Sequence, residues 1–449
     1  MKPNIPKGTR DFSPEQVRKR NYLFDVIRKV FVRYGYQPIE TSAFENLSTL
    51  TGKYGEEGDQ LLFKVLNNGD FLGGKGVDLE ALETKDSARL APTIARRGLR
   101  YDLTVPFARF VVMNQHALSF PFKRYQIQPV WRADRPQKDR YQEFYQCDVD
   151  VVGSDSLMYE AELAAIYDEV FAQLGLKVRI MLNNRKVLAG MAEVAGIPDR
   201  FMEMTVSIDK LDKIGMEGVK EEMAGRGIPE SSISRIENML SKDSLEEWKK
   251  ELAQNETGSK GIQELETVME YLGETNLTNE VTFTPTLARG LSYYTGCVFE
   301  VQALDMKMGS IGGGGRYDDL TSIFGLPNLS GVGVSFGAER IFNLMEELNR
   351  FPADLSEDLS LFFVAFDETA HRYAFRCLGQ VRNAGIAADL YPAPLKLKKQ
   401  MKYANDRKVP YVVLIGEEEI QSGKLSLKHM ETGQQQKLSL EEIIRLLSV

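Results

Sequence analysis

The sequence predicts an α+β fold in which an antiparallel sheet forms the core. Three observations lead to this class. Two alternating polar and apolar runs flank a charged loop between Phe122 and Gly153, helical charge-rich segments dominate residues 184–280, and strand and helix patterns alternate over residues 361–449. We therefore expect a core built from residues 1–183 and 281–350, a helical insertion at 184–280, a linker at 351–360 and a C-terminal α/β domain at 361–449.

Composition restricts the class of protein. The chain has 449 residues, of which 43% are hydrophobic and 27% charged, as in ordinary soluble globular proteins. No apolar run approaches the ~20 residues of a membrane span, and the N-terminus has no secretory pattern. The net charge of −8 means that a nucleic-acid partner would have to be bound through local basic patches.

Histidine and cysteine are scarce. The three histidines make a histidine-based zinc site or a Ser-His-Asp triad improbable. The three cysteines, Cys147, Cys297 and Cys377, lie far apart and match no metal spacing. We expect no protein metal site, no disulfide framework and a reducing cytoplasm.

The N-terminal third begins with a helix. Ser13 and Pro14 are typical of a helix start, and the helix is expected to end near Gly35. A short edge strand is expected at residues 37–41, because Pro38 is tolerated at an edge. That edge is either plain or meets a second subunit. A further strand is expected at residues 61–65.

The segment from Leu99 to Pro106 predicts a strand that leads into a helix, with Thr104 as the N-cap. Asp102 and Thr104 end this strand. Short polar side chains at such a place either cap the helix or line a site, and both interpretations are open.

The central hairpin carries an unusually polar face. Arg124, Gln126, Gln128 and Arg132 share a face of the first strand, and Phe144, Gln146, Asp148 and Asp150 share a face of the second. Either this face is solvated, as is common in antiparallel sheets, or it is functional. The loop from Ala133 to Tyr141 is densely charged.

Helix and strand patterns continue after the hairpin. We expect a helix at residues 156–174 and strands at 178–182 and 331–336. The four glycines Gly312–Gly315 form a flexible turn by default, or else allow the backbone to approach a ligand or another chain closely. A helix starts at Gly337 with Arg340 in its first turn, where a cation opposes the helix dipole. In the C-terminal domain we expect a largely parallel sheet, with strands at 361–366, 387–391 and 411–415. The expected helices there are 371–384, 397–406 and 438–447. A basic cluster in this domain is either a solvated face or an RNA-backbone patch. It consists of Lys396, Lys398, Lys399, Lys402, Arg407 and Lys408.

Several motifs resemble those of a known family. YGYQPIET (34–41), WRADRPQKDRYQEFYQ (131–146) and GVSFGAERI (333–341) resemble motifs 1, 2 and 3 of class II aminoacyl-tRNA synthetases. LARGLSYYTG (287–296) and GGGGRYDDL (312–320) are similar to the histidine-specific motifs of histidyl-tRNA synthetases. The resemblance covers nearly the whole chain. It implies a class II antiparallel catalytic core, an anticodon-binding C-terminal domain and a homodimer formed through the Pro38 region.

The resemblance also implies an activity. ATP with Mg²⁺, and no organic cofactor, would convert histidine to histidyl-adenylate, and the histidyl group would pass to the 3′ end of histidine tRNA. Arg132, Arg289 and Arg340 would be catalytic, and Arg132, Phe144 and Arg340 would bind ATP. Histidine would be bound by Asp102, Thr104, Arg132, Gln146, Asp150, Arg289, Tyr293 and Tyr294.

The hairpin loop and the C-terminal domain are implied to bind tRNA, through Arg135, Gln137, Lys138, Arg140, Lys398 and Lys399. This chain has Asp102 and Asp150 where many bacterial members have glutamate. The main rival is a regulatory subunit of ATP phosphoribosyltransferase, which has the same fold but usually lacks the C-terminal domain and the catalytic arginines. A second rival is an RNA-binding sensor module.

Overall fold

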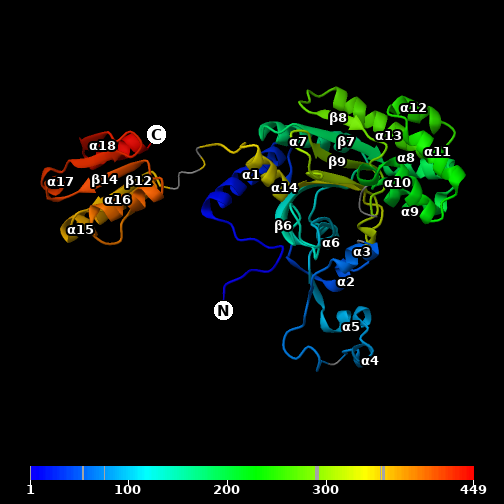
Figure 1. The fold of residues 1–449 in the computed structure, drawn as a ribbon, viewed down its shortest axis with the longest axis horizontal. Coiled ribbons are helices and arrows are strands. Elements are labelled where there is room, and N and C mark those ends of the chain that lie inside the picture. Colours follow the sequence, from blue (N-terminus) through cyan, green and yellow to red (C-terminus); the bar gives the residue numbers. More distant parts are fainter. Residues whose placement is uncertain are drawn as a thin grey trace. The chain divides into compact units, whose positions relative to one another are not determined.

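The computed structural model describes residues 2–52, 55–74, 76–288, 293–353, 355 and 359–448. The chain divides into two compact units, residues 1–350 and residues 351–449 (Figure 1). Across the described part of the chain, no helix combines the length and apolar character needed to cross a membrane.

A large sheet forms the centre of the first unit; the described residues give it eight strands. In sheet order they are β1 (Gln37–Pro38), β5 (Phe122–Trp131), β6 (Glu143–Val152), β11 (Gly331–Gly337), β10 (Gly312–Tyr317), β9 (Cys297–Ala303), β7 (Val178–Asn184) and β8 (Glu280–Phe283). Neighbours from β5 to β7 pair antiparallel. The edge strands β1 and β8 pair parallel with β5 and β7.

One face of this sheet is apolar and packs against helices. Phe336 of β11 contacts the rings of Phe31 and Tyr167, with centroid separations of 5.7 and 4.6 Å. These rings come from α1 (Pro14–Arg33) and α7 (Met158–Gln173), and α14 (Ala338–Glu347) packs against α1 and β6. Because side chains alternate along a strand, the residues between the apolar ones point to the opposite face.

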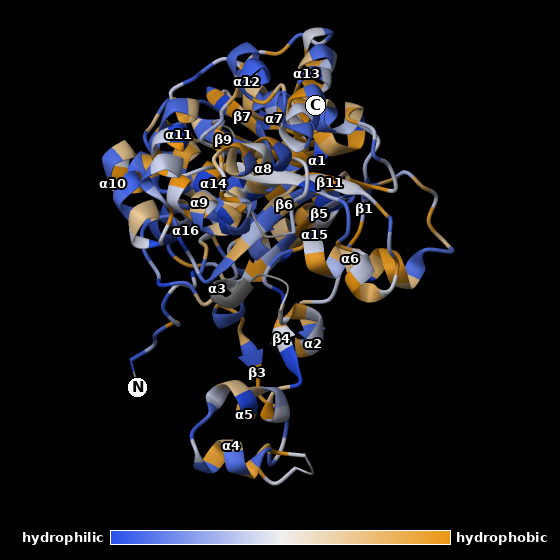
Figure 2. Cartoon of the chain, turned by 90° about the vertical axis from the view of Figure 1, so that its right-hand side faces the viewer, coloured by the Kyte–Doolittle hydropathy of each residue, from blue (hydrophilic) through white to orange (hydrophobic). Residues whose placement is uncertain are grey.

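A small sheet in the order β2 (Phe44–Asn46), β4 (Arg97–Leu99), β3 (Lys64–Val65) lies beside the large one. Short helices accompany it: α2 (Leu47–Leu50), α3 (Gly55–Gln60), α4 (Leu79–Glu83) and α5 (Ser87–Ile94). Figures 1 and 2 show α4 and α5 beyond β3, away from the large sheet. The chain then returns to the core through α6 (Thr104–Asn114).

Consecutive helices connect β7 to β8, drawn in green in Figure 1. They are α8 (Arg185–Val194), a 3-10 turn (Pro198–Arg200), α9 (Phe201–Ile208), α10 (Leu211–Gly225), α11 (Glu230–Leu240), α12 (Leu245–Glu251) and α13 (Glu256–Gly273). Helices α8 and α13 approach closely at two glycines, since a Cβ on Gly190 would lie 2.5 Å from the Cα of Gly258. Trp248 is fully buried among these helices.

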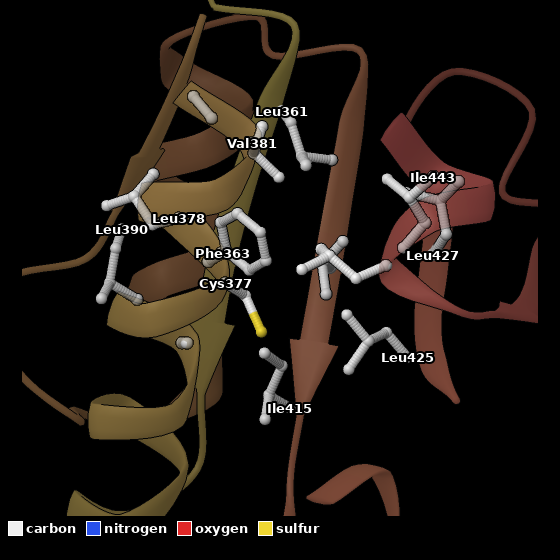
Figure 3. Close-up of a cluster of buried hydrophobic side chains, with 14 of the residues drawn as sticks. Leu361, Phe363, Cys377, Leu378, Val381, Leu390, Ile415, Leu425, Leu427 and Ile443 are labelled. Atoms are coloured by element: carbon white, nitrogen blue, oxygen red, sulfur yellow. The ribbon is translucent and has the colours of Figure 1, made fainter. Parts of the chain in front are cut away.

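The second unit is a sheet with helices. Its strands run in the order β13 (Ala388–Leu390), β12 (Leu361–Ala365), β14 (Tyr411–Ile415), β15 (Leu425–His429), β16 (Gln435–Leu438). Its helices are α15 (Glu368–Asn383), α16 (Leu397–Asp406), α17 (Glu417–Ser422) and α18 (Leu440–Leu447). Phe363 and Ile415 on the strands, Leu378 on α15 and Ile443 on α18 share one apolar core (Figure 3).

Many predicted elements are confirmed. Ser13 caps α1, with its side chain accepting the N–H of Gln16, and β1 is an edge strand that contains Pro38. Helix α16 and strand β14 have the predicted bounds. The polar face of the hairpin is not solvated, because Arg124 and Gln126 are buried.

Five expectations are wrong. The strand expected from Leu99 to the region of Asp102 and Thr104 ends at Leu99, the last residue of β4. Gly312–Gly315 form strand β10 rather than a turn, because neighbouring strands approach closely on both sides. Thr104 does not cap α6: the carboxylate of Asp102 accepts the N–H of Val105 at 3.1 Å. Only Lys64–Val65 of the segment 61–65 is a strand. The C-terminal sheet is parallel only from β13 to β14, since β15 and β16 are antiparallel strands in a polar segment that the pattern did not reveal.

Candidate active site

A small cavity of about 100 Å³ opens on the polar face of the large sheet, over β6, β10 and β11. Its walls include the residues expected to bind histidine, namely Asp102, Thr104, Arg132, Gln146, Asp150, Tyr293 and Tyr294. The remaining lining residues are Asp148, Gly313, Tyr317, Gly333, Val334 and Ser335. Arg289, which was expected to act here, lies outside the described residues.

Arg132 follows the end of β5 and is held by its surroundings. Its Nε donates to the carbonyl oxygen of Tyr101 at 3.1 Å. The guanidinium carbon lies 4.3 Å from the ring centroid of Tyr101 and 5.1 Å from that of Phe144. The half-buried cation therefore has a fixed direction at the cavity wall, with aromatic faces beside it that stabilise its charge.

Phe144 and Arg340 lie outside the cavity lining. Arg340 is in the first turn of α14, where its Nη1 donates to the carbonyl oxygen of Ser310 at 2.6 Å and its Nε to that of Asp139 at 3.4 Å. Two carbonyl dipoles thus offset the repulsion between this guanidinium and the positive end of the helix dipole. The same contacts join α14 to the hairpin loop and to the segment before β10.

One amide and two acidic side chains, those of Gln146, Asp148 and Asp150, line the cavity from β6. The Nε2 of Gln146 donates to the hydroxyl of Ser335 at 2.9 Å, while its Oε1 has no hydrogen-bond partner among the described residues. Burial raises the pKa of Asp148 to about 7, against the opposing influence of Arg124. Burial also raises the pKa of Asp150. These groups give the cavity several acceptors for a cationic or N–H-bearing ligand.

Asp102 performs both of the functions that were open from sequence. It is buried, it caps α6 through Val105, and it lines the cavity. Its carboxylate therefore reaches the cavity from a position fixed by the N-terminus of α6.

Backbone and aromatic side chains form the opposite wall. The Tyr317 hydroxyl donates to Oδ1 of Asp150 at 2.7 Å. The rings of Tyr293 and Tyr294 meet edge to face at 4.9 Å. A Cβ on Gly315 would lie 3.0 Å from the ring of Tyr294, and one on Gly333 would lie 1.9 Å from Oδ1 of Asp150. The glycines leave the room that these polar groups occupy.

The residues expected to bind tRNA face solvent. Arg135, Gln137 and Lys138 are exposed at the hairpin tip. Arg140 pairs with Asp134 at 2.9 Å, and Lys138 pairs with Glu347 at 3.1 Å. In the second unit, Lys398 and Lys399 are exposed on α16.

Several lining residues were missed by sequence reasoning. Asp148 shares the predicted face with Gln146 and Asp150, so the period of two could have found it. Tyr317 lies inside the quoted GGGGRYDDL motif. Gly333 and Ser335 lie inside the quoted GVSFGAERI motif, but only the pairing of β11 with β6 shows that they reach the site.

A larger groove of about 720 Å³ runs along α7, away from these residues. Its acidic side chains are engaged: Asp168 accepts backbone N–H groups of Thr278 and Asn279, and Glu162 pairs with Lys123. No group of three potential metal-binding side chains occurs in the described ranges. We therefore take the smaller cavity as the candidate active site.

Comparison with known proteins shows the family of the chain. A histidyl-tRNA synthetase family model matches residues 80–341, and an anticodon-binding domain model matches residues 358–449. The chain is similar to the histidine–tRNA ligase of Christiangramia forsetii (55% identity, 98% of this chain and 97% of the relative). It is also similar to that of Phocaeicola vulgatus (52% identity, 99% and 98%).

Solved structures give the same result. The crystal structure of histidyl-tRNA synthetase from Nostoc sp. PCC 7120 superimposes with a TM-score of 0.79 at 29% identity, over 99% of both chains. The fold is that of a class II aminoacyl-tRNA synthetase. Within that class, the chain belongs to the histidyl-tRNA synthetase family.

Proposed function

We propose that the protein is a histidine–tRNA ligase. A carboxylate oxygen of histidine attacks the α-phosphorus of ATP, diphosphate leaves, and histidyl-adenylate forms. A terminal ribose hydroxyl of histidine tRNA then takes the histidyl group, and AMP leaves. The observation that carries the proposal is the cavity beside β6, where a carboxylate, an amide and a guanidinium converge on a volume suited to one small polar ligand.

Amino-acid recognition follows from the donors and acceptors of this cavity. The ammonium group of histidine needs acceptors, and Asp102, Thr104 and Gln146 supply them. The imidazole has two ring nitrogens, one a donor and one an acceptor in the neutral ring. Asp150 accepts from the donor, and the hydroxyl of Tyr294 serves the other nitrogen.

Phosphate activation depends on fixed positive charge. Arg132 holds the histidine carboxylate and the α-phosphate, because a guanidinium fork matches both oxyanions. Phe144 stacks on adenine, Arg340 meets the γ-phosphate, and Arg289 acts as a further fixed cation beside the α-phosphate. Mg²⁺ enters with the ATP phosphates and neutralises their charge. Preorganised charge of this kind lowers the barrier to in-line displacement.

The proposal extends to partners. The hairpin loop meets the acceptor end of tRNA through Arg135, Gln137, Lys138 and Arg140. The C-terminal domain binds the phosphate backbone of the tRNA through Lys398 and Lys399. The exposed edge strand β1 joins two copies of the chain in a homodimer. The enzyme works in the cytoplasm.

ATP–diphosphate exchange with each of the twenty amino acids tests the activity. We expect exchange with histidine alone. Exchange with none of them, in folded protein, would favour the regulatory-subunit alternative, and exchange with another amino acid would overturn only the specificity.

A further inference from the structure

A buried ion pair lies behind the cavity, and its cation, Arg124, has no role in the function proposed above. Arg124 of β5 is fully buried, and its Nη2 lies 2.7 Å from Oδ2 of Asp150 on β6. Its guanidinium carbon lies 4.3 Å from the ring centroid of Phe107. The two residues are direct cross-strand partners, so the register of the hairpin sets their distance.

The other oxygen of Asp150 is held from a different strand. The Tyr317 hydroxyl of β10 donates to Oδ1 at 2.7 Å. Gly333, opposite Asp150 on β11, leaves the space that this oxygen occupies. Each carboxylate oxygen has two acceptor sites, so each keeps one for a ligand in the cavity.

The cation beside this carboxyl group favours its ionised form. Burial raises the pKa of Asp150, and the charge of Asp102 raises it further, while Arg124 and the Tyr317 hydroxyl lower it. Besides burial, the charge of Asp150 in turn raises the pKa of three neighbouring groups, namely Asp148 on β6, Tyr294 before β9 and Tyr36 before β1. A protonated carboxyl would present a donor where the N–H of an imidazole needs an acceptor.

We propose that Arg124 is a positioning residue for amino-acid recognition: it fixes Asp150 as an oriented anion that accepts the imidazole N–H of histidine. The inference rests on the proposed function, in which Asp150 binds the ring. It also accounts for aspartate at this position, since a short carboxylate is directed to the neighbouring strand, where Arg124 lies opposite it.

The test is ATP–diphosphate exchange with R124M, R124K and Y317F, from pH 7 to pH 9. At pH 7 we expect R124M to raise the KM for histidine about 10- to 100-fold, the usual cost of losing a group that orients a ligand-binding side chain. The KM for ATP should stay close to the wild-type value, because Arg124 contacts Asp150 and none of the residues proposed to bind ATP. The ratio of variant to wild-type KM should fall as pH rises, because a higher pH favours the ionised form of Asp150.

The companion variants separate orientation from folding. R124K keeps the charge and should retain most of the affinity for histidine, and Y317F should show a smaller defect than R124M with the same recovery at high pH. R109M is the matched control, because it breaks the ion pair between Arg109 and Glu45 (2.6 Å) outside the cavity lining. It should leave both KM values unchanged.

The outcomes are distinguishable. Absence of histidine exchange in the wild-type protein would overturn the proposed function. Normal wild-type exchange together with a pH-independent R124M defect, or with equal increases in both KM values, would overturn only the role of Arg124. If R124M does not fold, R124K and Y317F decide: a pH-independent Y317F defect, or loss of histidine affinity in folded R124K, would overturn the inference.

Discussion

The side-chain amide of Gln146 donates to the hydroxyl of Ser335 across the β6–β11 pair, at 2.9 Å. The same hydroxyl bonds the carboxylate of Asp148. This chain of hydrogen bonds fixes which end of the amide is the donor, so the carbonyl oxygen Oε1 is the acceptor at the cavity wall. An acceptor with a fixed direction suits an ammonium group.

Gln146→Leu should therefore weaken histidine binding selectively. A hydrogen bond to a charged group contributes about 1.5–3 kcal/mol, so the KM for histidine should rise about 10- to 150-fold with the KM for ATP unchanged. Gln263→Leu, at an exposed position on α13, is the control. Parallel increases in both KM values would contradict a role in binding the amino acid.

Asp148→Asn should change how stability depends on pH. The pKa of Asp148 is about 7 in the folded protein, compared with an ordinary value of about 3.9. Between these values the folded state binds the proton more tightly, so the free energy of unfolding falls as pH rises, by up to about 1.4 kcal/mol per pH unit. Asparagine does not titrate, so the free energy of unfolding of the variant does not fall for this reason.

Denaturant unfolding at pH 5 and pH 8 measures the effect. The stability of Asp148→Asn relative to wild type should increase from pH 5 to pH 8. Asp155→Asn, at an exposed position, serves as the control and should show no such trend. A pH-independent difference between Asp148→Asn and wild type would show that the carboxyl group does not titrate in this range.

Gly333→Ala should abolish amino-acid activation. The added Cβ would lie 1.9 Å from Oδ1 of Asp150, so either the carboxylate or the strand must move. Gly379→Ala on α15 is the matched control, since no atom lies within 4 Å of its added Cβ. That control should keep full exchange activity and gain up to about 1 kcal/mol of stability. Activity of Gly333→Ala close to wild type would contradict the close approach.

Arg289→Ala should lower the rate of adenylate formation about 10²–10³-fold, because it removes ~3–4 kcal/mol of transition-state stabilisation. The expectation comes from the family resemblance. Single-turnover measurement separates this rate from product release. Near-normal turnover would remove Arg289 from the catalytic set.

Charge reversal at Lys398 and Lys399 should weaken tRNA binding and reduce its salt dependence, while histidine-dependent exchange continues. Reversal of Lys424 and Lys437 gives the same change in net charge at residues that pair with Glu442 and Glu418. Equal effects of the two double variants on tRNA affinity would indicate a general charge effect. Loss of exchange would indicate a folding defect.

Much of the fold could be predicted because period and capping are local properties. The helix start at Ser13 and the alternation of Gln146, Asp148 and Asp150 are visible within a few residues. The resemblance then correctly identified the synthetase family and its class II fold. The geometry of Asp150 could not be obtained in this way, because it depends on the register that places Arg124 on one side and Gly333 on the other.

The glycines of β10 show the same limit. In isolation they predict a flexible turn, whereas in the sheet they admit a neighbouring main chain: a Cβ on Gly314 would lie 2.2 Å from the carbonyl oxygen of Gly333. The glycine run also leaves a close backbone approach open, but only the adjacent strands, which are distant in sequence, decide between this and a turn.

The wall that Gly313 and Gly333 provide has a consequence for amino-acid selection. Main chain in a paired sheet has no side-chain rotamers to change, so this part of the cavity wall cannot move aside for a larger amino acid. A smaller one meets no such barrier and is rejected only by the polar groups it leaves unsatisfied, which is where the protein's accuracy is decided.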